Sequence, residues 1–246
     1  MDPLQLFRAG KLSEAISGLN EALRNDPANQ KQRTFLFELL CFSGEYDRAE
    51  KQLNILEQEG SKDSFLGTLL YKAALNAERT RQEMFEKKSY PKQTVDGAGA
   101  AQVRGKLNGK EFQTLSDADP RIGEKLEVFA GGDYMWISFQ DISAVRMEAP
   151  KRLRDLLWAP AKLVTGPTFQ SRDLGEILLP ALSPGSWGHP EDEVKLGRVS
   201  EWCEDEAGEV APFGQKNLLV DGEEVPFLEV RELEIYPANA GPAAGA

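Results

Sequence analysis

Residues 10–27 read GKLSEAISGLNEALRNDP, and residues 44–60 read GEYDRAEKQLNILEQEG. The second stretch repeats residue types of the first at a constant spacing of 34 positions. The matched pairs are Gly10 and Gly44, Leu12 and Tyr46, Ala15 and Ala49, and Leu19 and Leu53. Glycine permits a tight turn between helices, and small or apolar residues at helical spacing form a stripe that packs on a neighbouring helix. The repeat therefore predicts a stack of paired helices.

A 34-residue period is that of tetratricopeptide repeats, in which each unit is a helical pair. We expect helices at about residues 3–9, 12–25, 29–42, 46–58 and 63–88. Pro27 ends the second of these because proline cannot continue the hydrogen-bond ladder. Two repeats and one long helix are fewer than the three units that a free-standing array needs. The last helix is therefore expected to pack against the rest of the chain.

Stacked helical pairs leave a concave face, which is lined by the first helix of each pair. Such a groove accepts an amphipathic helix or an extended peptide of a partner protein. The residues expected to line it and to bind the partner are Lys31, Thr34, Glu38, Phe65, Thr68 and Lys72. The alternative interpretation is a structural helical bundle without a partner.

Composition and charge restrict the classes of partner. The chain is 41% hydrophobic and 28% charged, as in globular proteins. Residues 1–90 carry 14 acidic and 13 basic side chains, whereas the remainder carries 26 and 16 and so has a net charge of −10. Because such a chain repels phosphate backbones, nucleic acid is not expected as a partner. A partner with a basic flank would associate faster with it.

The location of the protein is predicted from the segments that the sequence lacks. There is no apolar run long enough to cross a membrane, and the start MDPLQLFRAG has no signal-peptide pattern. Cys41 and Cys203 are the only cysteines, which is no disulfide framework. We expect a cytoplasmic protein without membrane insertion and with reduced thiols.

The pattern changes after the helical domain at residues 1–90. Residues 91–101 read as a linker, residues 102–236 as a β-rich α+β domain, and residues 237–246 as a disordered tail. The fold class is therefore α+β, with a tetratricopeptide-like domain followed by a β-rich domain. Hairpins are expected around Asn108-Gly109 and Gly131-Gly132, with later strands near residues 142–148, 162–165, 175–180, 195–202 and 225–235. A short helix is expected to open at Pro150 and to stop before Pro160.

The motifs of common enzyme classes are absent. The chain contains no G-x-S-x-G elbow, no P-loop and no Rossmann glycine pattern beside a helix. Its only histidine, His189, lies near Glu191, Asp192 and Glu193, but zinc sites use three or four ligands at set spacing. We expect no catalytic, cofactor-binding or metal-binding residues, and no cofactor.

One loop is the candidate for carboxylate chemistry. Asp117 and Asp119 lie two residues apart in the segment DADPRIG, as in some general acid/base sites. The interpretation that we favour is an Asx-type loop in which Arg121 pairs with a nearby carboxylate. The alternative is an enzyme that uses both carboxylates, with Arg121 as an anion clamp.

Aromatic residues recur through the second half. Tyr134, Trp136 and Phe139 follow one another closely, and Trp158 lies downstream. Large aromatic side chains dominate cores and interfaces, so these four are expected to pack the core and join the domains.

The second half resembles a known family. The segments that carry the resemblance are, in order, LNGKEF, LSDADPRIG, LEVFAGGDYMWISFQDI, PKRLRDLLWAPAKL, GEILLPALSPGS and LGRVSEW. Their order and spacing are similar to those of the ImpE family, also called TagJ, whose members are accessory proteins of the bacterial type VI secretion system. The start LFRAGKLSEAI fits the same family. The positions that match its pattern are Asp117, Asp119, Arg121, Tyr134, Trp136, Trp158, Arg198 and Trp202.

This resemblance implies a non-enzymatic accessory protein in the cytoplasm that contacts the contractile sheath. It implies that the partner is an N-terminal helix of the small sheath subunit, of the TssB or VipA type. Two alternatives stay open: the carboxylate-dependent enzyme described above, and a structural scaffold whose incomplete helical array serves only to dimerise.

Overall fold

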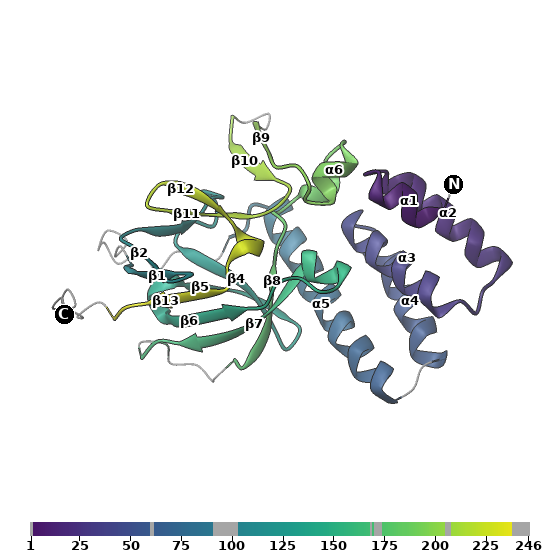
Figure 1. Cartoon of the computed structure of the whole chain (residues 1–246), viewed down its shortest axis with the longest axis horizontal. Helices are drawn as coiled ribbons and strands as arrows, with labels where there is room; N and C mark the ends of the chain where they lie inside the picture. Colours follow the sequence, from purple (N-terminus) through teal and green to yellow (C-terminus); the bar gives the residue numbers. More distant parts are fainter. Residues whose placement is uncertain are drawn as a thin grey trace.

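The computed structural model describes residues 2–59, 62–90, 103–167, 169, 174–204 and 208–237, without the side chains of residues 59 and 62–66. Helices come first and a sheet-rich part follows, which confirms the predicted α+β class (Figure 1). The helices are α1 (Pro3–Arg8), α2 (Leu12–Asn25), α3 (Gln30–Phe42), α4 (Tyr46–Glu59) and α5 (Lys62–Glu86). Each lies within two residues of a predicted helix.

The repeat glycines have the role that the sequence predicts. Gly10 and Gly44 stand in the turns before α2 and α4 with φ angles of 78° and 72°, a region that favours glycine. A Cβ atom on Gly44 would lie 2.6 Å from the ring of Trp187, and one on Gly10 would lie 2.8 Å from Glu193. Both turns therefore pack closely against the second half of the chain.

The large sheet has eight antiparallel strands in the order β2-β1-β13-β6-β7-β8-β4-β5. Their bounds are β1 (Gly105–Leu107), β2 (Lys110–Phe112), β4 (Lys125–Ala130), β5 (Asp133–Ser138), β6 (Ile142–Met147), β7 (Trp158–Thr165), β8 (Glu176–Pro180) and β13 (Glu232–Ile235). The two predicted hairpins are confirmed: β1 pairs with β2 around Asn108-Gly109, and β4 pairs with β5 around Gly131-Gly132.

Two smaller sheets flank the large one. One has the order β12-β11-β3, and the other is the hairpin β9–β10. Their strands are β3 (Leu115–Asp117), β9 (Glu201–Glu204), β10 (Val210–Phe213), β11 (Asn217–Val220) and β12 (Glu223–Pro226). A short helix, α6 (Asp192–Lys195), lies beside α1 and α2 in Figure 1.

The helices and the large sheet share one hydrophobic core. Phe129 of β4, Trp158 of β7 and Leu178 of β8 are buried in the same cluster as the inward residues of α2, α3, α4 and α5. A second cluster joins the large sheet to the three-stranded sheet. As the repeat count predicts, α5 packs on the sheet, and Figure 1 shows it between the other helices and the strands.

The predicted helix from Pro150 to Pro160 is wrong. The segment forms only a 3-10 turn, η2 (Leu153–Leu156), and Pro160 lies inside strand β7. The strand tolerates this proline because pairing with β6 begins at Ala161, so Pro160 has a strand neighbour on the β8 side only. Leu153 and Leu156 of the amphipathic pattern lie in this 3-10 turn, and the strand begins at Trp158.

The C-terminal strand predictions are partly wrong. Residues 195–200 form the end of α6 and a turn, and β9 begins only at Glu201. The predicted strand at 225–235 is divided into β12 and β13 by the 3-10 turn η4 (Phe227–Glu229). Strands β3, β10 and β11 were not predicted: each is only three or four residues long, and β3 pairs with β11, a segment far away along the chain. The predicted linker and all but the first residue of the predicted tail lie outside the described residues.

Candidate partner-binding groove

A groove of about 480 Å³ lies between α3 and α5. It brings together three of the predicted partner-binding residues, Lys31, Thr34 and Thr68. Its other walls are Gln30, Phe37, Leu53, Leu56, Gly67, Leu70, Tyr71, Arg152 and Arg154. The first helices of successive pairs therefore form the groove, as tetratricopeptide geometry predicts.

Of the other three predicted residues, Lys72 and Glu38 do not line this groove. Lys72 forms an ion pair with Glu57, with 2.5 Å between Nζ and Oε2. Glu38 points inward from α3 and is buried. The side chain of Phe65 lies outside the described part of the chain.

Arg152 and Arg154 reach the groove from the second half of the chain. The Arg154 guanidinium lies 4.4 Å from the ring centroid of Tyr71 and 3.8 Å from a carboxylate oxygen of Glu38. With Lys31 they make three basic side chains, and no aspartate or glutamate stands among the described residues that line the groove. The sequence carried no local signal for either arginine, since more than a hundred residues separate them from α3.

Glu38 is held in an unfavourable place for a carboxylate. Burial raises its pKa from 4.5 to about 7, and the nearby guanidinium of Arg154 only partly opposes this rise. Part of the Glu38 population is therefore protonated near neutral pH. In that state Glu38 does not offset the positive charge of Arg154.

A second, smaller hollow continues from the groove. It measures about 170 Å³ and lies between α5 and strands β4, β7 and β8. Leu70 and Tyr71 line both spaces, and Ala73, Ala74 and Phe129 make the hollow largely apolar. Leu70 is also about half exposed, and with Leu69, which is 54% exposed, it places apolar surface on this part of α5.

A buried charge network connects α5 to the sheet. Arg81 of α5 donates from Nε and Nη2 to the two carboxylate oxygens of Glu127 in β4, at 2.7 and 2.9 Å. It also donates to Glu78 at 3.0 Å and to the carbonyl oxygen of Leu182 at 2.9 Å. Burial alone would raise the pKa of Glu127, but Arg81 and Lys216 outweigh it and lower the pKa to about 2. Glu127 is therefore fully ionised in the folded protein.

The candidate catalytic loop belongs to this network. Lys216 lies 2.6 Å from Oδ2 of Asp117 and also contacts Glu127. Burial raises the pKa of Asp117 to about 6, against the opposing effect of Lys216. The Asp117 carboxylate accepts from the amide of Asp119 at 2.9 Å, and Asp119 pairs with Arg121 at 2.6 Å. The Asx-type loop with a local arginine partner is confirmed.

The aromatic residues of the family pattern support the same contact. Tyr134 donates to Glu127 at 2.6 Å, and the Trp136 indole donates to the Tyr134 hydroxyl. The indole of Trp158 donates to Glu78 of α5 at 3.0 Å. These contacts and the burial of Phe139 in the core of the second half confirm the expected packing, and it is Trp158 that bonds directly to the helical domain.

The last two positions of the family pattern behave differently from each other. Arg198 donates to the carbonyl oxygens of Phe7 and Arg8 at 2.7 and 3.1 Å, and so holds the loop after α6 against the end of α1. Trp202 of β9 is 48% exposed. Of the eight positions, only Trp202 presents a large apolar side chain to solvent.

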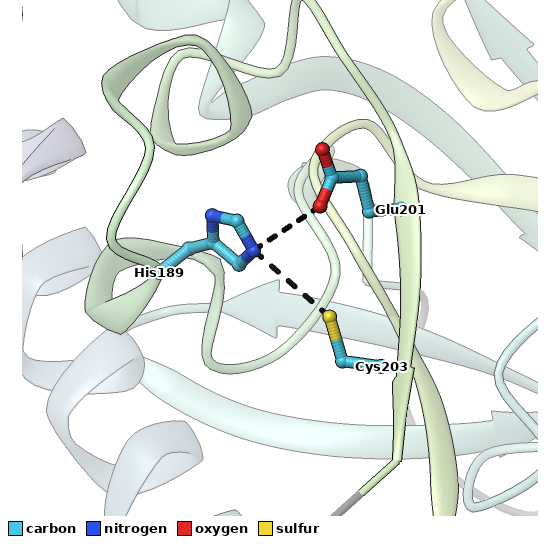
Figure 2. Close-up of side chains that lie close together, drawn as sticks. All are labelled: His189, Glu201 and Cys203. Atoms are coloured by element: carbon cyan, nitrogen blue, oxygen red, sulfur yellow. Dashed lines mark hydrogen bonds and ion pairs between the residues drawn. The ribbon is translucent and has the colours of Figure 1, made fainter.

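The structure brings His189 together with residues that the sequence did not indicate. Figure 2 shows Nε2 of His189 facing Glu201, 3.5 Å away, and Cys203, 3.9 Å away. These three side chains could hold a metal ion by distance alone. The predicted neighbours Glu191, Asp192 and Glu193 are not part of this cluster.

The hydrogen bonding of His189 does not fit a metal ligand. Its Nδ1 accepts from the amide of Glu191 at 3.1 Å, so a neutral ring carries its proton on Nε2. A histidine that binds metal through Nε2 instead donates from Nδ1 to an acceptor. The arrangement suits a histidine that donates to the Glu201 carboxylate, and the absence of a metal stays a prediction.

The fold and the groove define a class of protein, a tetratricopeptide-like helical array joined to an antiparallel β-rich domain. A tetratricopeptide repeat model matches residues 6–70. The ImpE protein family model matches residues 109–234, and the chain belongs to the ImpE family. The resemblance inferred from the sequence is thereby confirmed.

Two relatives extend this comparison. The chain is 31% identical over 269 aligned residues to the type VI secretion system accessory component TagJ of Pseudomonas aeruginosa, which covers 96% of this chain and 92% of that protein. The crystal structure of protein VPA1032 from Vibrio parahaemolyticus has a TM-score of 0.80 at 20% identity, over 95% of this chain and 97% of that one. At that identity the second comparison shows a shared fold. Among the described residues, no helix is both long and apolar enough to span a membrane.

Proposed function

We propose that this chain is a non-enzymatic accessory component of type VI secretion that binds the N-terminal helix of the small sheath subunit. The groove between α3 and α5 is the observation that carries this proposal. Family membership and the name of the Pseudomonas relative support the secretion system as the setting. The cytoplasm is the expected location, because the sheath subunit is the partner.

The groove has the features that a helix-binding site requires. Phe37, Leu53, Leu56 and Tyr71 supply apolar surface along its length, and Thr34 and Thr68 supply polar groups on facing helices. An amphipathic helix laid in a groove inserts apolar anchors at helical spacing, while its polar side chains stay at the rim. A single helix buries an area at the low end of specific interfaces, and we expect micromolar affinity.

The buried network supports the non-enzymatic part of the proposal. Asp117 and Asp119, the carboxylates of the enzyme alternative, are buried and already bound to Lys216 and Arg121. A general base needs a proton of the substrate within hydrogen-bond reach. These carboxylates instead fix their own loop and the Lys216 ammonium, which also contacts Glu127.

A peptide titration tests the proposal. The probe is a synthetic peptide of the N-terminal helix of the small sheath subunit from the same bacterium, and calorimetry measures its Kd. Thr34→Arg places a long cationic side chain in the groove, and we expect it to weaken binding at least tenfold. Thr80→Arg is the matched control, because each threonine bonds the carbonyl four residues earlier in its helix and Thr80 lies outside the groove.

Two results would contradict the proposal. The first is no binding by wild-type protein whose unfolding transition shows that it is folded. The second is equal binding by the wild type and Thr34→Arg, which would place the helix elsewhere on the molecule.

A further inference from the structure

The hairpin β9–β10 presents an exposed apolar pair. Trp202 is 48% exposed and Val210 is 44% exposed. In the strand register Trp202 faces Pro212 and Glu204 faces Val210, so Trp202, Glu204 and Val210 share one face of the hairpin. Trp202 and Val210 are diagonal cross-strand neighbours, which an aromatic side chain can bridge.

Trp202 stands apart from the other tryptophans of the chain. All four tryptophans lie in the part of the chain that the structure describes, and Trp202 is the one in the exposed class. Trp158 and Trp136 donate hydrogen bonds inside the molecule, and Trp187 packs against the turn at Gly44. Exposed tryptophan is enriched among the residues that dominate binding energy in protein interfaces.

The same hairpin carries a concentrated negative charge. Residues 201–213 contain five acidic side chains and no basic one. At the loop end of the hairpin Glu209 pairs with Lys88 at the end of α5 (2.6 Å), and at its base Glu201 faces His189. Glu204 is exposed on the face that holds Trp202. The apolar pair therefore lies in a locally negative field, which attracts cations and repels phosphate polymers.

The hairpin is separate from the groove between α3 and α5. The groove contacts α5 at residues 67–71, whereas the hairpin contacts Lys88, just beyond the other end of that helix. Fifteen residues separate Tyr71 from the helix end at Glu86, which is about 22 Å at 1.5 Å per residue. Figure 1 shows β9 and β10 at the end of the molecule away from the start of α5. The two surfaces also differ in sign, because the groove is lined by basic side chains.

We propose that the face formed by Trp202, Glu204 and Val210 is a second docking surface, which takes a basic segment of a protein partner. An arginine or lysine of that segment lies over the Trp202 ring and pairs with Glu204. An apolar residue beside it covers Val210. This surface is distinct from the proposed helix-binding groove. It is a binding site for the basic flank that the acidic second half of the chain leads us to expect on a partner.

Designed peptides test this proposal directly. The first probe is an 18-residue peptide in which arginine and leucine alternate. The second probe has the same sequence with glutamate in place of every arginine. Fluorescence anisotropy at about 50 and 300 mM NaCl spans a large change in screening length. We expect the arginine peptide to bind the wild type, at least tenfold more weakly at the higher salt, and the glutamate peptide not to bind.

Variants locate the bound peptide. Trp202→Ala and Glu204→Lys should each weaken the arginine peptide about tenfold with an unchanged thermal transition. Val164→Ala is the control for an exposed apolar residue, because Val164 is 53% exposed on β7. Glu14→Lys is the control for charge reversal at an exposed site on α2. Neither control should alter the affinity.

The outcomes separate the two proposals. If the sheath-helix peptide does not bind but the arginine peptide binds through Trp202, the groove function fails and the hairpin surface stands. No binding of the arginine peptide, or equal binding by the wild type and Trp202→Ala, would overturn the hairpin surface. So would a wild-type dimer in solution that Trp202→Ala dissociates, since the apolar pair would then be covered by a second copy.

Discussion

At the residue scale, Glu127 is the centre of the contact between helices and sheet. Its carboxylate accepts two hydrogen bonds from the Arg81 guanidinium and one from the Tyr134 hydroxyl. It also accepts a hydrogen bond from the Lys216 ammonium. Burying two cations and a carboxylate together is tolerable only while every charge keeps its partner. Arg81, Lys216 and Tyr134 therefore stabilise the buried Glu127 carboxylate together.

We expect Glu127→Gln to destabilise the protein by about 3–5 kcal/mol, the usual cost of removing one partner from a buried ion pair. The amide removes the carboxylate that Arg81 and Lys216 share, so Arg81 keeps only Glu78 and Lys216 keeps only Asp117 as a charged partner. Urea unfolding measures the loss. Glu83→Gln, on the exposed side of the same helix α5, is the control and should leave the midpoint unchanged. A similar midpoint for Glu127→Gln would show that the network is not needed for stability.

Glu38 introduces a pH dependence at the same scale. Its pKa is about 7 when folded and near 4.5 when unfolded, so the folded state holds a proton that the unfolded state has already lost. The stability from this group is present below pH 4.5 and is lost as the pH rises through about 7. We expect Glu38→Gln to remove this loss. At pH 8 the free energy of unfolding of the variant should exceed that of the wild type by about 1–3 kcal/mol.

Urea titrations of both proteins at pH 5 and pH 8 measure this difference. Comparing the wild type with the variant cancels the other titrating groups, of which Asp117 is one. Glu14→Gln serves as an exposed control on α2. A variant that loses as much stability as the wild type between the two pH values would refute the role assigned to Glu38.

At the element scale, the turn before α4 has both a local and a tertiary role. Gly44 adopts a positive φ that ends α3, and its missing side chain lets the ring of Trp187 approach. Trp187 belongs to η3 (Ser186–Gly188), which lies 143 positions away along the chain. The repeat motif therefore shapes both the helical pair and its contact with the second domain.

We expect Gly44→Ala to cost about 2–3 kcal/mol, because it adds a clash to the roughly 1 kcal/mol for alanine at positive φ. Gly109→Ala is the matched control: Gly109 has a φ of 82° and open space around a built Cβ. Gly109→Ala should therefore lose only the roughly 1 kcal/mol that alanine costs at a positive φ angle. Thermal unfolding compares the two, and equal losses would mean that the Trp187 contact adds nothing.

At the scale of the whole molecule, the helical array and the sheet share one hydrophobic core. The core that fills the helices also contains Phe129, Trp158 and Leu178 from the sheet. The buried network adds charge-assisted hydrogen bonds across the same contact. Neither half encloses its apolar surface without the other.

We therefore expect a fragment of residues 1–90 not to unfold cooperatively when heated. Circular dichroism would follow its helicity, and the full chain would give the reference transition. Adding a separately purified fragment of residues 103–246 should restore a sigmoidal transition. A sharp melt of the first fragment by itself would show that two repeats suffice.

The sequence by itself determined the elements whose signals are local. The 34-residue repeat placed five helices to within two residues, and the Asn108-Gly109 and Gly131-Gly132 turns placed two hairpins. Periodicity and turn chemistry act over a few residues, so they are readable without a fold. The same reasoning misread Pro150 to Pro160, because a strand with one neighbour near its start accepts the proline that was taken to end a helix.

Only the tertiary structure decided the chemistry of the surfaces. It placed Arg152 and Arg154 in the groove beside Lys31, bound Asp117 to Lys216, and left Trp202 exposed. Each of these outcomes depends on residues that are far apart along the chain and meet through strand pairing and helix packing. The sign of the charge that lines a groove and the exposure of an aromatic ring both depend on these long-range contacts, and no local sequence pattern encodes them.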